Sequence, residues 1–144
     1  MTLGLVSNGL GRGYGQDVLD AFDLRKYFAA CVFREDVARG KPWPDSILTA
    51  LRGIGRDLRP QDVIWYVGDQ RKDIAAALAA SEVLGRSIRP IAMGARAALG
   101  AVDARLGPSQ IMWAPADLER ALFGDFADSH ERLLREDALA APYF

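Results

Sequence analysis

The stretch "LGLVSNGLGRGYG", residues 3–15, ends a short apolar run at residue types that bind anionic oxygen. Ser7 supplies a hydroxyl where the apolar run stops, and backbone N–H groups around Asn8 and Gly9 can converge on the same phosphoryl oxygen. The glycines at positions 9, 11, 13 and 15 contain G-x-G but not the full G-x-G-x-x-G spacing of a dinucleotide-binding site. Residues 7–9 are therefore the candidate phosphate-binding segment, and a glycine turn without a ligand is the alternative.

Two further stretches carry charged residues that suit phosphate chemistry. In "RGKPWPD", Lys41 stands before two prolines that fix the chain direction, which favours an ammonium group held toward a charged partner. In "VIWYVGDQRKD", Asp69 follows an apolar run and Asp73 comes four residues later. Ligands of parallel α/β sheets bind beyond the carboxyl ends of the strands, so these carboxylates are candidate Mg²⁺ ligands. The alternatives are an ordinary surface lysine and a plain acidic residue in the first turn of a helix.

Strand-length apolar runs alternate with segments of helical periodicity along the chain, which predicts an α/β fold. The expected strands are Leu3–Val6, Ala30–Phe33, Val63–Val67, Ile88–Met93 and Ile111–Trp113. The expected helices are Gln16–Tyr27, Asp45–Arg56, Asp73–Ser81, Arg96–Arg105 and Pro115–Phe123. Such alternation is typical of a Rossmann-like parallel sheet flanked by helices on both faces.

Composition limits the classes of protein that this sequence fits. The 144 residues suit one domain, and half of them are hydrophobic. A formal net charge of −1 gives no general attraction to nucleic acid or to an anionic membrane. The single cysteine, Cys31, and the absence of a long apolar stretch or a leader predict a soluble cytoplasmic protein. We expect a core domain over residues 1–124 and a charged helix with an apolar tail over residues 125–144.

The order and spacing of the three stretches resemble the haloacid dehalogenase-like (HAD) hydrolase superfamily, and the resemblance extends from residue 3 to about residue 123. In HAD phosphatases an aspartate attacks a phosphoryl group, and water hydrolyses the aspartyl-phosphate that results. The resemblance implies that Ser7 holds a phosphoryl oxygen, helped by the backbone around Asn8 and Gly9. It also implies that Lys41 neutralises charge at the reacting centre.

The resemblance assigns the two acids Asp69 and Asp73 to Mg²⁺, which they would position directly or through water. Such an assignment suits phosphoryl transfer, which depends on positioning and on compensation of negative charge. The implied substrate is a small phosphorylated metabolite.

The sequence departs from the family at the first motif. Asp-x-Asp-Gly, which supplies the nucleophile and the general acid–base, is absent from these 144 residues. We therefore expect a core that is incomplete at its N-terminal side, because the first-motif strand lies between the strands ending at Ser7 and Asp69 in this fold. These two strands would then pair directly or receive a strand from another chain. Only 27 residues separate Lys41 from Asp69, too few for an inserted cap domain.

Three hypotheses about function follow. The first is a portion of a Mg²⁺-dependent HAD-like phosphatase that is inactive as this chain alone, because the nucleophile is missing. The second is a non-catalytic HAD-like binding or assembly protein, such as a strand-exchanged homo-oligomer or one half of a pair with a complementing chain. The third, a dinucleotide-binding oxidoreductase, leaves Lys41 and Asp69 without a role.

Overall fold

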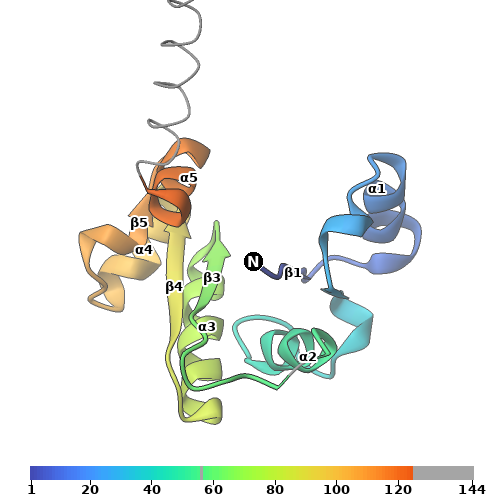
Figure 1. The fold of residues 1–144 in the computed structure, drawn as a ribbon, viewed down its shortest axis with the longest axis horizontal. Coiled ribbons are helices and arrows are strands. Elements are labelled where there is room, and N and C mark those ends of the chain that lie inside the picture. The colour runs from blue at the N-terminus through green and yellow to red at the C-terminus, as the bar shows by residue number, and fades with distance from the viewer. Residues whose placement is uncertain (56, 125–144) are drawn as a thin grey trace, which may run out of the picture.

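The computed structural model describes residues 1–55 and 57–124, which form five strands and five α-helices in alternating order (Figure 1). The strands are β1 (Gly4–Val6), β2 (Ala30–Val32), β3 (Ile64–Gly68), β4 (Ile88–Met93) and β5 (Ile111–Met112). The helices are α1 (Gln16–Ala21), α2 (Asp45–Gly53), α3 (Arg71–Leu84), α4 (Ala95–Asp103) and α5 (Pro115–Phe123). The predicted charged helix at 125–139 lies outside the described residues.

The first expected helix is shorter than predicted. Helix α1 ends at Ala21, and Asp23 adopts a left-handed backbone with φ 51°. Leu24 N–H donates to the Leu19 carbonyl at 2.7 Å and Asp23 N–H to the Asp20 carbonyl at 3.2 Å, which is the Schellman pattern of a helix end. The periodicity of residues 16–27 therefore covers one helix and a separate 3₁₀ turn at Arg25–Tyr27.

The strands form two parallel sheets. In one sheet β1 pairs with β2, and in the other the order is β3-β4-β5. Strands β1 and β3 do not pair with each other, so among the described residues each has a strand neighbour on one side only. Figure 1 shows the two groups of strands apart, with α2 on the chain path between them. The sequence predicted that these two strands would either pair directly or receive a strand from another chain. The prediction of direct pairing is wrong.

The hydrophobic core holds the two sheets together through α2 and α3. Ile47 of α2 packs in one cluster with three alanines of α3 and with Ile88 of β4. A second cluster joins Ile74 of α3 to Ala92 of β4 and to two alanines of α4. Alanine on α3 allows its neighbours to approach closely. The packing thereby fixes the start of α2, which follows Lys41, relative to α3, which contains Asp73.

These observations confirm the predicted α/β class of parallel sheets flanked by helices. Within the described part of the chain, no helix is both long and apolar enough to span a membrane.

Candidate active site

Ser7 is held at the carboxyl end of β1. Its backbone N–H donates to the Val32 carbonyl at 2.9 Å, which extends the β1–β2 ladder by one bond. Its Oγ accepts the N–H of Gly9 at 3.0 Å. The hydroxyl therefore retains its hydrogen for donation to an anionic oxygen. This geometry is compatible with the phosphate-binding role predicted for Ser7 and Gly9, which stays a prediction.

The side chain of Asn8 clamps the lysine loop. Its Nδ2 donates to the Lys41 carbonyl at 2.9 Å, and its Oδ1 accepts the Lys41 backbone N–H at 2.8 Å. The carboxamide thus satisfies both backbone polar groups of one residue, as a neighbouring strand would. Sequence reasoning assigned the backbone around Asn8 to phosphate and missed this clamp. No local pattern signals it, because the two residues are 33 positions apart.

Lys41 reaches from the β1 side of the molecule to α3. Its Nζ lies 2.7 Å from Asp73 Oδ1, and the two side chains are only 9% and 3% exposed. The same Nζ donates to the Val6 carbonyl at 3.4 Å, at the last residue of β1. An ammonium group has three hydrogens, so one remains for a further anionic partner. The predicted lysine is therefore an internally paired cation and not a surface side chain.

Asp73 is engaged through both carboxylate oxygens. Oδ2 accepts the Gln70 N–H at 2.9 Å, which closes the first turn of α3, and Oδ1 forms the ion pair with Lys41. Gly68 permits this packing, since a Cβ there would stand 2.2 Å from the Asp73 Cβ. Asp73 is thus both an acid in the first turn of a helix, as the alternative interpretation had it, and the ion-pair partner of Lys41.

The carboxylates of the described residues do not complete a metal site. Asp69 is exposed just beyond β3, whereas the oxygens of Asp73 are occupied as above. No group of three or more Asp, Glu, His or Cys side chains suited to a metal occurs in residues 1–55 and 57–124. Of the two predicted Mg²⁺ ligands, Asp69 is therefore the one with an exposed side chain, and its role as a ligand stays a prediction.

Tyr66 borders the ion pair, a role that the sequence did not indicate beyond packing. Lys41 Nζ lies 5.8 Å from the centre of its ring, within the range of a cation–π contact. Burial, and then the negative charges of Asp73 and Asp69, raise the pKa of the Tyr66 hydroxyl well above its ordinary value. The hydroxyl therefore stays protonated beside these acids.

Arg39 and Trp43 lie on either side of the lysine in sequence. The Arg39 guanidinium stacks 4.4 Å from the Trp43 ring and pairs with both oxygens of Asp45. Trp43 is 53% exposed. It is therefore an exposed aromatic covered on one side by an arginine.

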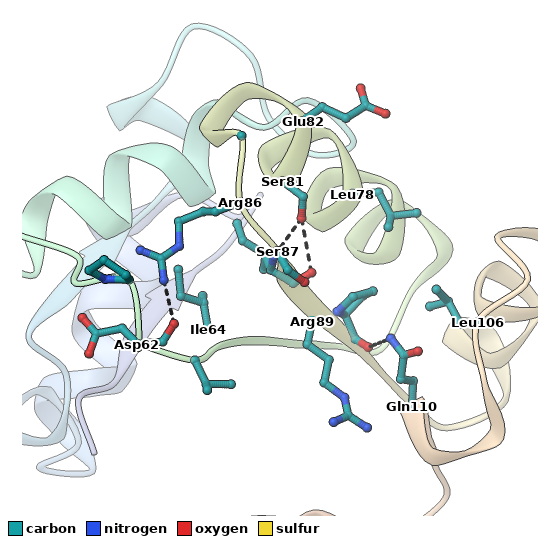
Figure 2. Close-up of a pocket in the computed structure, with 15 residues that line it drawn as sticks. Asp62, Ile64, Leu78, Ser81, Glu82, Arg86, Ser87, Arg89, Leu106 and Gln110 are labelled. Atoms are coloured by element: carbon teal, nitrogen blue, oxygen red, sulfur yellow. Dashed lines mark hydrogen bonds between the residues drawn. The ribbon is translucent and has the colours of Figure 1, made fainter.

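A cavity of about 890 Å³ lies at the other end of the strands (Figure 2). Ile64 and Ile88, the first residues of β3 and β4, line it, whereas none of the six predicted site residues does. The Arg86 guanidinium donates to the Asp62 carbonyl. In Figure 2 the Arg89 side chain extends away from Arg86, and its guanidinium donates to Ser109 Oγ. The guanidinium groups of Arg86 and Arg89 thus point apart in this cavity.

Comparison with known proteins identifies the class to which this arrangement belongs. The model of the haloacid dehalogenase-like hydrolase family matches residues 1–82, which include all the predicted site residues. The chain belongs to this family.

Phosphoglycolate phosphatases are among its similar relatives. The Escherichia coli K12 protein is 39% identical over 80 residues, and the Salmonella choleraesuis protein is 35% identical over 80 residues. Each match covers 56% of this chain and 30% of the relative, so the chain spans under a third of their length.

Solved structures give the same result. A HAD-superfamily hydrolase from Ehrlichia chaffeensis aligns with a TM-score of 0.55 and 28% identity, over 65% of this chain and 41% of that protein. A subfamily IA hydrolase from Geobacter sulfurreducens aligns with a TM-score of 0.52 and 27% identity, over 65% and 42%. A Thermotoga maritima protein with 23% identity and a TM-score of 0.58, over 85% and 50%, shows the fold alone.

Proposed function

We propose that this chain is the phosphate-binding part of a Mg²⁺-dependent phosphatase core that acts on small phosphomonoesters. The observation that carries the proposal is the buried Lys41–Asp73 pair, which joins the lysine motif to the aspartate motif at the carboxyl ends of β1 and β3. The similarity to phosphoglycolate phosphatases makes phosphoglycolate the first substrate to test.

Each site residue has a defined part in this proposal. Ser7 donates its hydroxyl hydrogen to a phosphoryl oxygen, and the remaining hydrogen of Lys41 Nζ meets another. Asp73 holds the ammonium group in place through the ion pair. Asp69 supplies one carboxylate toward Mg²⁺, whose other ligands come from outside the described residues.

We further propose that these 144 residues, as a separate polypeptide, do not turn over substrate. They contain no Asp-x-Asp-Gly motif, and so no nucleophile in the family's sense. A cavity of about 240 Å³ lies between the two sheets and is lined by Gly4 and Val6 of β1, Ile64 and Tyr66 of β3, and residues of α2. In this proposal the first-motif strand would run between β1 and β3, along this cavity. The single cysteine supports a cytoplasmic location.

Titration of the ¹⁵N-labelled chain with inorganic phosphate tests the binding role. Chemical-shift changes are expected at Ser7, Gly9 and Lys41, and Ser7→Ala should weaken them. Changes confined to the residues around Arg86 and Arg89 would place the anion site at the other end of the strands and contradict the proposal. Glu82→Gln, at an exposed residue of that other cavity, is the control and should leave the Ser7 response unchanged.

A second candidate function is assembly with another copy or a complementing chain. It is favoured by the edges of β1 and β3, which have no neighbouring strand among the described residues. Exposed strand edges are templates for pairing with a further strand. Val63, immediately before β3, is 79% exposed. Light scattering after size-exclusion chromatography should then give a dimer or larger species. A clean monomer over a wide concentration range would count against self-assembly.

A further inference from the structure

The glycine turn that follows Ser7–Gly9 is bound by a carboxylate from another loop. Gly11 N–H lies 2.8 and 2.9 Å from the two oxygens of Glu35, and Arg12 N–H donates to Oε1 at 3.0 Å. Successive backbone N–H groups of this kind form a site for negative charge. Here the chain's own glutamate supplies that charge.

The segment that presents Glu35 is itself fixed. Phe33 is 2% exposed, and its ring packs so closely under the turn that a Cβ on Gly11 or Gly15 would stand 2.8 or 2.3 Å from ring carbons. Arg34 N–H donates to the Gly9 carbonyl at 3.0 Å. Phe33 N–H donates to Asp36 at 2.8 Å. Glu35 is therefore held at one place relative to the phosphate-binding segment.

We infer that Glu35 is a positioning residue, whose carboxylate occupies the glycine turn and holds residues 7–9 in register with the Lys41 loop. Two side chains set this register: Glu35, which accepts from the turn, and Asn8, whose carboxamide binds the backbone of Lys41. The N–H groups of Gly11 and Arg12 are consequently not available to a substrate phosphate or a dinucleotide. The link to phosphate binding rests on the proposed function, whereas the contact of Glu35 with the glycine turn does not.

The charge state of Glu35 agrees with this role. Its hydrogen bonds from the backbone of Gly11, and then of Arg12, hold the pKa of the carboxyl below its ordinary value of 4.5, and the Arg12 guanidinium adds a smaller effect. Asp36 and Arg34 are the neighbouring charged groups on its own turn. The pKa of Glu35 is lowered in the folded state. The stability that its carboxylate contributes is therefore fully present above pH 4.5, and it is lost as the pH falls through the folded pKa.

Amide exchange and phosphate titration of three variants test the inference. In Glu35→Ala, exchange of the Gly11 and Arg12 amides should rise about tenfold or more. Phosphate affinity at Ser7 and Lys41 should fall while the β3–β4–β5 amides stay protected. Glu35→Gln, which keeps one acceptor oxygen, should lie between Glu35→Ala and the unmodified chain. Asp17→Asn, at an exposed acid of α1, should change neither quantity.

A pH titration separates positioning from mere loss of stability. The Gly11 and Arg12 amide shifts of the unmodified chain should titrate below pH 4.5, and those of Glu35→Gln should not. Unchanged exchange in Glu35→Ala would overturn the inference. Absence of phosphate binding in the unmodified chain would instead contradict the proposed function, and the exchange data would still decide the role of Glu35.

Discussion

At the scale of single residues, the site depends on side chains that bind backbone. Asn8 and Glu35 each use a planar polar group to satisfy backbone N–H or carbonyl groups of a loop distant in sequence. Such contacts position the segments that carry Ser7 and Lys41. Buried or half-buried polar groups are costly to leave unpaired, so these contacts contribute to stability as well as to geometry.

Asn8→Ala should lower the free energy of unfolding by about 1–3 kcal/mol, because it removes both hydrogen bonds to Lys41. Asn8→Asp should cost a similar amount at neutral pH, since a carboxylate oxygen would then face the Lys41 carbonyl. That cost should shrink as the pH falls below about 4, where the new acid is protonated and can donate. Urea denaturation measures these values.

The control for this pair is Gln61→Ala, which removes an exposed amide and should change stability by less than about 0.5 kcal/mol. If Asn8→Ala lowers the free energy of unfolding no more than the control does, the Asn8–Lys41 hydrogen bonds do not contribute to stability.

At the scale of elements, the close packing of the β3–α3 turn against the first turn of α3 determines the positions of Asp69 and Asp73. Strand β3 ends at Gly68, and the first turn of α3 folds back so that Asp73 packs against that glycine. The exposed Asp69 and the buried Asp73 are consequences of this one turn. Identical residue types four positions apart thus receive different chemical roles.

Gly68→Ala should destabilise the protein by about 1–3 kcal/mol, because its Cβ would overlap Asp73. Gly107→Ala is the matched control: its φ is −71° and no atom lies within 4 Å of the added Cβ. That control should be neutral or stabilising by up to about 1 kcal/mol. Thermal and denaturant unfolding compare the two, and equal effects would contradict the packing described for β3 and α3.

Much of the element order follows from the sequence. Strand β4 and helix α5 have the predicted bounds, and the other strands differ by one residue at their ends. Apolar runs and helical periods are local, so they are readable in a single chain. The Asn8–Lys41 and Glu35–Gly11 contacts, in contrast, join residues 33 and 24 positions apart and leave no periodic trace. The end of α1 was missed because an aspartate, and not a glycine, occupies its left-handed position.

At the scale of the whole molecule, two sheets share one core and one buried ion pair. The hydrophobic contact of α2 with α3 and the Lys41–Asp73 pair hold the β1–β2 unit against the β3–β4–β5 unit. The edges of β1 and β3 remain without a strand between them in the described chain. In residues 1–55 and 57–124, the loops that carry Ser7 and Lys41 therefore lie beside strand edges that have no neighbouring strand.

Lys41→Met should destabilise the protein by about 3–5 kcal/mol, because Asp73 would remain buried without its cation. The double variant Lys41→Met with Asp73→Asn should recover a large part of that loss, since the asparagine oxygen can still accept the Gln70 N–H. Equilibrium unfolding of the single and double variants gives the coupling energy. Strictly additive losses would show that the pair does not join the two sheets.

The central claim is tested most directly by hydrolysis of an aryl phosphate with Mg²⁺, measured on the 144-residue chain alone and on the same chain joined to an upstream segment that carries Asp-x-Asp-Gly. The chain alone should show no turnover above the blank. The joined chain should show Mg²⁺-dependent turnover that Lys41→Met abolishes. Robust turnover by the chain alone that disappears in Asp69→Ala would contradict the account.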